Sequence, residues 1–334
     1  MERVKQIILK NTAGAILLVL CVAAAIGVRG FFSPRNLVNL LSQMSILALM
    51  GMGMIYSVVL KGPDLSVGAV GALSGVLSAY AGLWLMARMQ ENMPVLLVIL
   101  VLLGVAAVTG IALGYITGTL IVTVRIAPVI CSLAIMYIVR GLAYALSGGQ
   151  PVYVHSDAFA FLGTGKLIPV PGMSTGILPV VLILAVAAAL VHCRILKGTQ
   201  LGKNLYSVGL NREAAARAGV DVRRTMRIGY LMCSVMAALA GVVNASRFQN
   251  GHPGAMDGFE MYALPAVVLG GVSLTGGKGS VGGAMLGVAV IAVLRNGMDL
   301  LLLSSYWQKI VMGAVLVLAI WHDAGHPLKE AKDS

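Results

Sequence analysis

Long apolar segments, separated by short polar stretches, follow one another along the whole of this sequence. An α-helix that crosses the hydrocarbon core of a bilayer needs about 17–25 mostly apolar residues, and most of these segments reach or approach that length. They cover residues 12–28, 37–60, 65–86, 93–124, 127–146, 176–191, 226–245, 261–274, 281–303 and 307–321. This pattern predicts an all-α polytopic membrane protein.

The charge composition agrees with that class. Only 11% of the 334 residues are charged, whereas a soluble domain carries about 25%. The formal net charge is +12, but the cations lie beside apolar segments, where they indicate topology. No basic stripe alternates with stacking aromatic residues, so the expected partner is the lipid bilayer and not nucleic acid. The four cysteines and five histidines lack ligand spacing, so no metal site is predicted.

The distribution of cations predicts which loops face the cytoplasm. Residues 149–174 hold one lysine, Lys166, whereas eight cations lie in or next to residues 195–225, namely Arg194, Lys197, Lys203, Arg212, Arg217, Arg223, Arg224 and Arg227. Because loops rich in Lys and Arg stay on the cytoplasmic side, we expect both termini and residues 195–224 there, and residues 149–174 outside. Residues 12–28 are interpreted as a first span; the alternative is a cleaved signal peptide, which the longer spans that follow disfavour.

The polar interval at residues 201–227 contains a short helix with clear ends. Asn211 is a good N-cap, Glu213 suits the first turn, and three alanines follow. Gly219 fits the left-handed residue that closes a helix, so residues 212–218 should form about two turns. Two interpretations remain for this interval: a solvated cytoplasmic loop, or a surface that docks a cytoplasmic partner.

Two of the apolar segments are interrupted. Residues 61–64 break the chain between two spans, and Asp64 can cap the second of them. Residues 261–274 are short for a span and lead into a glycine-rich stretch, as segments lining a transport pathway do. Residues 58–68 and 267–282 also resemble each other, which indicates either a weak internal repeat or chance similarity.

The apolar segment at residues 93–124 is not interrupted, but three of its glycines are spaced four residues apart. This spacing predicts a closely packed neighbouring helix.

The sequence holds no recognisable catalytic set. Residues 271–279 resemble a phosphate-binding loop, but Val272 and Gly279 occupy positions where that pattern needs Gly and Ser or Thr. Neither paired carboxylates, nor a Ser-His-Asp set, nor a zinc-protease motif is found. We therefore expect no catalytic residue, no cofactor and no nucleotide site in this chain.

Charged residues within or beside the spans are few, and each is costly in hydrocarbon unless it meets a partner. They are Asp64, Arg140, Glu260, Arg295 and Asp299. Arg295 and Asp299 are four residues apart and can pair on one helix face. Arg140 has no local partner, and our hypothesis is that it pairs with Asp64. The alternative is that Arg140 extends to the membrane interface while Asp64 acts only as a helix cap.

Five stretches together are similar to one family, the permease subunits of ATP-binding-cassette (ABC) importers for ribose and other simple sugars. The stretches are residues 61–68, 138–141, 205–219, 267–280, and 296–297 with 304–308. They are spread over most of the chain, and their combination is specific although each alone is weak. The sequence departs from the family pattern at residues 61–63 and at residues 128–134.

This resemblance implies a single transmembrane domain over residues 1–334, with about ten helices, in the bacterial inner membrane. It implies three protein partners: a cytoplasmic ABC ATPase, an extracytoplasmic sugar-binding protein, and a second permease copy in a homodimer or heterodimer. Residues 195–225 then resemble the loop that couples to the ATPase, with Asn211, Arg212, Glu213, Ala214, Ala215 and Gly219 as its key positions. Candidates for the translocation pathway are Asp64, Ser66, Arg140, Glu260 and Asn296.

The favoured interpretation is therefore an ATP-driven importer subunit for a monosaccharide such as ribose, with no covalent chemistry of its own. A secondary transporter of a small polar solute is the main alternative. Against it, the spans contain no series of acidic residues for proton coupling, and the helix at residues 212–218 would have no partner. A membrane-embedded enzyme comes third, because a catalytic set is missing.

Overall fold

The computed structural model describes residues 12–89, 93–168 and 178–324, and these form thirteen α-helices, a π-helix and two short strands. The helices are α2 (Thr12–Gly27), α3 (Pro34–Val59), α4 (Val67–Met89), α5 (Val95–Thr119), the π-helix Leu120–Val124, α6 (Pro128–Ser147), α7 (Asp157–Thr164), α8 (Val180–Gly198), α9 (Gln200–Leu210), α10 (Arg212–Arg217), α11 (Val222–Phe248), α12 (Glu260–Leu269), α13 (Val281–Leu300) and α14 (Ser305–Ala324). The strands β1 (Val152–Tyr153) and β2 (Asn250–Gly251) pair antiparallel.

The predicted class of all-α polytopic membrane protein is confirmed. Among the described residues, seven helical segments are long and apolar enough to cross a membrane: α3, α4, α5 with the π-helix, α6, α8, α11 and α13. Three shorter apolar helices, α2, α12 and α14, accompany them. Large apolar side chains such as Tyr137, Ile138 and Leu190 are mostly exposed, as expected for a surface that faces lipid.

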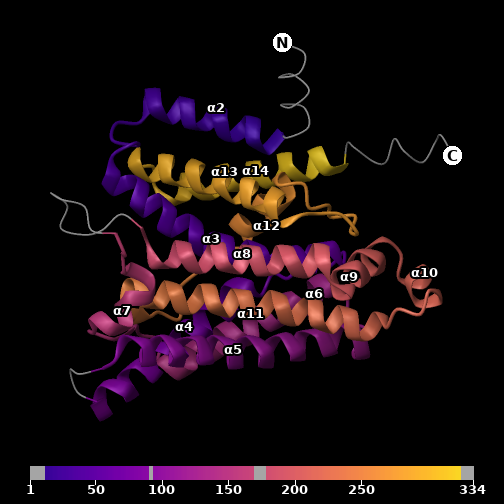
Figure 1. Ribbon diagram of the computed structural model, residues 1–334, viewed down its shortest axis with the longest axis horizontal. Helices are drawn as coiled ribbons and strands as arrows, with labels where there is room; N and C mark the ends of the chain where they lie inside the picture. Colours follow the sequence, from indigo (N-terminus) through magenta and orange to yellow (C-terminus); the bar gives the residue numbers. More distant parts are fainter. Residues whose placement is uncertain (1–11, 90–92, 169–177, 325–334) are drawn as a thin grey trace.

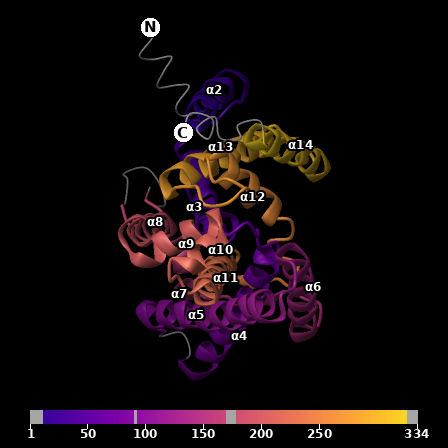
Figure 2. The same ribbon diagram turned by 90° about the vertical axis from the view of Figure 1, so that its right-hand side faces the viewer.

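The long helices lie side by side along the longest axis of the molecule, and α11 lies at their centre (Figures 1 and 2). It packs against α3, α4 and α5. On α5, Gly110, Gly114 and Gly118 each approach the backbone of α11, where an added Cβ would lie 3.1 Å or less from its atoms. The close helix contact predicted from the glycine spacing is therefore confirmed.

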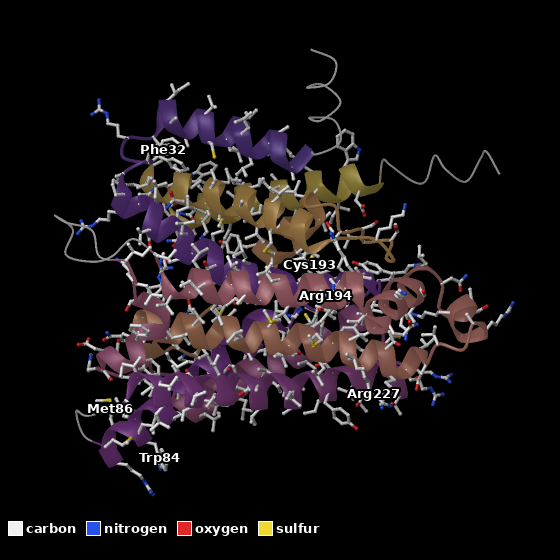
Figure 3. All side chains as sticks on the ribbon, in the orientation of Figure 1. Phe32, Trp84, Met86, Cys193, Arg194 and Arg227 are labelled. Carbon is white, nitrogen blue, oxygen red and sulfur yellow. The ribbon has the colours of Figure 1, made fainter. Side chains whose placement is uncertain are left out.

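The two ends of the molecule differ in composition. α7 lies at one end, here called the α7 end, and α10 lies at the other, the α10 end (Figure 1). Arg194 and Arg227 lie toward the α10 end, whereas Phe32 and Trp84 lie at the α7 end (Figure 3). The cation-rich loop and the loop with one lysine are thus at opposite ends, as the predicted topology requires. Both termini, which we also expect to be cytoplasmic, lie outside the described residues.

Both interrupted segments turn sharply between helices. α3 closes through Lys61 in a left-handed conformation, with Lys61 N and Gly62 N donating to Val58 O and Ser57 O. α12 closes in the same way through left-handed Gly271. Lys61 and Gly271 therefore hold equivalent positions in the two turns. The similarity between residues 58–68 and 267–282 in the sequence gives an alignment that differs from this one by one residue. Since α10 closes by the same hydrogen bonds around Gly219, the closure does not distinguish a repeat from chance, and the repeat remains a prediction.

Several local predictions were incomplete. The segment at residues 176–191 extends as α8 to Gly198, and the polar interval after it begins with a helix, α9, that we did not predict. α9 buries Leu205 and Val208 while Lys203 remains exposed, so its amphipathic pattern was hidden by the density of polar residues. The loop expected outside the membrane contains α7, whose N-cap Ser156 accepts a hydrogen bond from Phe159 N.

Candidate functional site

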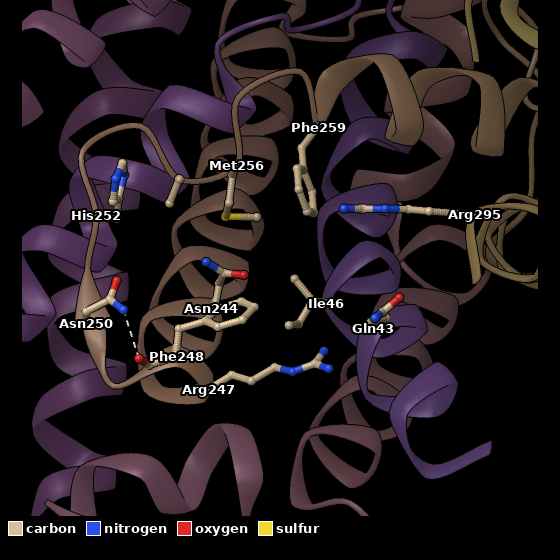
Figure 4. A pocket seen from close by; sticks show the side chains of 11 residues that line it. Gln43, Ile46, Asn244, Arg247, Phe248, Asn250, His252, Met256, Phe259 and Arg295 are labelled. Atoms are coloured by element: carbon tan, nitrogen blue, oxygen red, sulfur yellow. Dashed lines mark hydrogen bonds between the residues drawn. The ribbon is translucent and has the colours of Figure 1, made fainter. Parts of the chain in front are cut away.

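A cavity of about 380 Å³ lies among α3, α11, α13 and the loop that joins β2 to α12 (Figure 4). We call it the central cavity; its lining residues are Gln43, Ile46, Asn244, Arg247, Phe248, Asn250, His252, Ala255, Met256, Phe259 and Arg295. Its volume is within the range of roughly 300–1,000 Å³ that is usual for small-molecule sites. It is the strongest candidate for a solute site in the described part of the chain.

The lining of the central cavity combines carboxamides with aromatic rings. Gln43, Asn244 and Asn250 offer both donors and acceptors, and Phe248 and Phe259 offer apolar ring faces. Asn250 Nδ2 donates to Phe248 O at 2.9 Å, which fixes the amide and leaves its oxygen as an acceptor. Such a wall suits a small solute that is rich in hydroxyl groups and has one apolar face.

Two arginines extend into this space from different helices, Arg247 from α11 and Arg295 from α13 (Figure 4). Arg247 Nη2 donates to Asn39 Oδ1 on α3. The guanidinium of Arg295 lies over the rings of Phe259 and Tyr262, 5.1 and 4.7 Å from their centroids. Its buried Nε–H has no acceptor. Neither arginine forms an ion pair with a carboxylate among the described residues.

A second cavity, of about 490 Å³, adjoins the first toward the α7 end. Its lining residues are Ser33, Arg35, Asn36, Val38, Asn39, Ser42, Gly163, Thr164, Lys166, Arg247 and Leu300. Arg247 lines both cavities. The hydrogen bond between Arg247 and Asn39 therefore lies on the wall that separates them.

Asp64 and Ser66, two of the predicted pathway residues, lie together in the break between α3 and α4, and both are fully buried. Asp64 Oδ1 accepts hydrogen bonds from Ser66 N at 2.9 Å and from Ser66 Oγ at 2.6 Å, whereas Oδ2 has no partner. Burial raises the pKa of the Asp64 carboxyl, and the bonds from Ser66 act in the opposite direction. Neither residue lines the central cavity.

The hypothesis that Arg140 pairs with Asp64 is wrong. Arg140 Nη1 donates to Pro253 O at 2.9 Å and to Ala255 O at 2.7 Å, and Nη2 lies 3.9 Å from Asp257 Oδ1. Asp64 is instead bonded within its own turn. The guanidinium thus holds the loop between β2 and α12, which supplies Met256 and Phe259 to the central cavity.

Glu260 and Asn296 also lie outside the lining of the central cavity. Glu260 begins α12, is 8% exposed, and leaves its Oε2 without a partner. Asn296 exchanges two hydrogen bonds with Asn36 on α3, at 2.8 and 3.0 Å. The suggested pairing of Arg295 with Asp299 is not formed, because Asp299 accepts from Gln308 Nε2 at 2.9 Å and Arg295 turns to the aromatic rings.

The predicted short helix in the cation-rich loop is confirmed as α10. Asn211 Oδ1 accepts hydrogen bonds from Glu213 N at 2.9 Å and Ala214 N at 3.0 Å. Gly219 has a φ of 82° and closes the helix, as expected. Within α10 only Ala215 is buried, while Arg212, Glu213 and Ala214 are exposed. The helix therefore presents most of its surface at the α10 end of the molecule.

The preceding helix, α9, contacts both interrupted segments. Gly209 lies against Val59 O of α3 and against Gly277 of the loop before α13, so closely that a Cβ there would overlap both. Gly277 N donates to Val59 O at 2.9 Å, which joins the two breaks directly. Lys61 Nζ donates to Leu210 O at 3.0 Å, and Tyr206 Oη donates to Gly279 O at 2.9 Å. α9 is thus in contact with both breaks.

Comparison of the sequence with known proteins places the chain in a family. Residues 36–320 match the family described as the branched-chain amino acid transport system / permease component. The chain is 34% identical over 297 residues to the ribose import permease protein RbsC of Escherichia coli (strain K12), covering 88% of this chain and 87% of that protein. It is 36% identical over 315 residues to RbsC of Bacillus subtilis (strain 168), covering 92% and 90%. It is 32% identical over 290 residues to the D-allose transport system permease protein AlsC of Escherichia coli (strain K12), covering 87% and 83%. No solved structure gives a significant match.

Proposed function

The chain belongs to this family of permease components, and we propose that it is the membrane-spanning subunit of an ABC importer that carries a monosaccharide across the bacterial inner membrane. The observation that carries the proposal is its similarity, over most of its length, to relatives named as permeases for ribose and D-allose. The central cavity supports it, because carboxamides and aromatic rings are suited to hydroxyl groups and to the apolar face of a sugar ring.

In this proposal residues 1–334 form one transmembrane domain and residues 195–225 couple it to a cytoplasmic ATPase. α10 is the docking helix, because it is exposed, capped at both ends and placed at one end of the molecule. α9 conveys its displacement to the breaks at residues 60–66 and 270–280 through Gly209, Lys61 and Tyr206. ATP binding by the partner then favours one of two conformations of the pathway.

The α7 end of the molecule is the side at which a solute-binding protein delivers the sugar in this proposal. The second cavity faces that end and adjoins the central cavity, so solute passes from one to the other at Arg247. A second permease copy, identical or related, completes the importer. Four of the predicted pathway residues line neither cavity, namely Asp64, Ser66, Glu260 and Asn296. Their place in the pathway is proposed for the conformation that opens to the cytoplasm.

Uptake of labelled sugars into vesicles tests the proposal. Vesicles that contain the chain with its co-purifying ATPase and a sugar-binding protein should accumulate D-ribose or another aldose only when ATP is supplied. Uptake that continues without ATP and stops when ion gradients collapse would instead identify a secondary transporter. The absence of any nucleotide-binding subunit after mild purification would also contradict the proposal.

The docking role of α10 has a separate test. Glu213→Arg places a cation in the first turn of a helix, where an anion is favoured, and changes the charge of the exposed face. We expect ATP-driven uptake to be lost while the protein still inserts into the membrane. If uptake and ATPase assembly survive both Glu213→Arg and Gly219→Val, α10 does not dock the ATPase.

A further inference from the structure

We propose that the central cavity selects an acidic monosaccharide, one that carries a carboxylate, and that Arg247 and Arg295 bind this group. The inference rests on the proposed transport of a sugar and narrows its chemical class. Relatives named for ribose and D-allose act on neutral sugars, so a preference for a sugar acid would set this chain apart from them.

The first step in the argument is the balance of charge. The central cavity is lined by two arginines and by no aspartate or glutamate. Two guanidinium groups that line one cavity of about 380 Å³ repel each other, and an anion between them would relieve that repulsion. Acidic residues do exist nearby in sequence, but they lie elsewhere: Asp257 lies near Arg140, Asp299 bonds to Gln308, and Glu260 Oε2 lies beside Gly68 of α4.

The second step is the state of the two side chains. Arg295 is held in place by two aromatic rings, so its orientation is fixed before a ligand arrives. Its buried Nε–H has no acceptor, and a buried donor without a partner is unfavourable until a ligand supplies one. Arg247 has only the neutral Asn39 oxygen as a side-chain acceptor. A carboxylate supplies two acceptor oxygens with the charge and planarity that a guanidinium binds best.

The third step is the approach to the cavity. The second cavity is lined by Arg35, Lys166 and Arg247 and again by no acidic residue. A recessed path lined by positive charges raises the local concentration of anions and steers them inward. The amides of Gln43, Asn244 and Asn250 remain for the sugar hydroxyls, so the same cavity offers groups for the carboxylate and for the hydroxyls.

Matched pairs of sugars test the class of ligand directly. The purified full-length chain in lipid nanodiscs is titrated with D-galacturonate and D-galactose, and with D-glucuronate and D-glucose, while its melting temperature is followed. Within each pair the members differ only at carbon 6, as carboxylate or hydroxymethyl. We expect the acid to bind about 10- to 100-fold more tightly than its neutral counterpart, since hydrogen bonds between charged groups are roughly twice as strong as those between neutral groups.

Variants separate the arginine effect from loss of folding. Arg295→Gln should abolish the preference for the acid, whereas Arg295→Lys should keep most of it. Arg88→Gln is the matched control, because Arg88 lies over Trp84 at the end of α4 and outside both cavities, and the preference should persist there. Equal affinity within each pair, a preference for the neutral sugars, no binding of either acid, or a preference unchanged in Arg295→Gln would each overturn the inference. ATP-driven uptake of neutral sugars alone would overturn it while leaving the proposed importer function in place.

Discussion

Replacing Gly209 with alanine should separate α9, the helix before the docking helix, from the two breaks that α9 contacts. The Cα of Gly209 is enclosed by Val59 O and by Gly277, and an added Cβ would lie 2.7 Å from Gly277 N and closer still to Val59 O. Ordinary contact begins at 3.4 Å, so the Gly277 loop would have to move by about 0.7 Å and Val59 O by more than that. That movement breaks the hydrogen bond from Gly277 N to Val59 O, now 2.9 Å long.

The expected change in stability is modest. Overpacking costs about 1–3 kcal/mol, and the lost hydrogen bond costs about 0.5–1.5 kcal/mol. Alanine in place of glycine stabilises the helix itself by up to about 1 kcal/mol. The free energy of unfolding should therefore fall by about 0.5–4.5 kcal/mol, which lowers the melting temperature by several degrees and leaves the protein folded.

The expected change in transport is larger, because the contact connects α9 to both breaks. Free energies that couple two sites are typically about 1–3 kcal/mol, so loss of the link should reduce ATP-driven uptake by roughly 5- to 150-fold. The assay compares initial uptake rates in vesicles with the melting temperature of the same variant. Gly282→Ala is the control, since a Cβ there meets nothing within 4 Å at the start of α13. Uptake by Gly209→Ala at the rate of Gly282→Ala would refute the reasoning.

Three further predictions concern the contacts of Arg140, the pair of asparagines and the membrane topology. Arg140→Leu removes the donor that holds Pro253 O and Ala255 O, so hydrogen exchange of residues 252–257 should speed up by tenfold or more, about 1.4 kcal/mol; unchanged exchange would contradict this. Asn36→Ala and Asn296→Ala should each destabilise the protein by about 1–3 kcal/mol, and a double-mutant cycle should give a coupling of about 1 kcal/mol, whereas additivity would mean that the pair contributes nothing. Cysteines introduced at positions 203 and 212 should react only with reagents added from the cytoplasmic side.

The parts of the structure that could be predicted from sequence depend on short-range signals. The ends of α10 follow from Asn211 and Gly219, whose preferences for a cap and for a positive φ act within one turn. The approach of α5 to α11 follows from three regularly spaced glycines, and the apolar lengths give the spans. These features need no knowledge of what lies across the molecule.

The central cavity could not be predicted in the same way, because its walls come from segments about 200 residues apart. Gln43 and Asn244 are polar residues within mostly apolar helices, and this is the one signal in the sequence that could have indicated them. The partner of Arg140 had no signature in the sequence at all. It proved to be a pair of backbone carbonyls, and every residue type offers one.

α3 and α13 are joined near both of their ends, which restricts how the central cavity can open. Asn36 and Asn296 join them toward the α7 end, and the bond from Gly277 N to Val59 O joins them toward the α10 end. We therefore expect solute to enter by separation of α11 from this pair, and the bond between Arg247 and Asn39 lies across that boundary.

Removing the acceptor in Asn39→Ala should favour this separation, since a hydrogen bond to a charged group contributes about 1.5–3 kcal/mol, or roughly 10- to 100-fold in population. A cysteine at position 244, in a cysteine-free background, reports it by its rate of reaction with a thiol reagent added from the α7 end. The rate should rise at least about tenfold in Asn39→Ala and remain unchanged in Arg88→Gln. An unchanged rate in Asn39→Ala would mean that α11 is not the moving wall, and that solute reaches Asn244 by a path that does not pass Arg247.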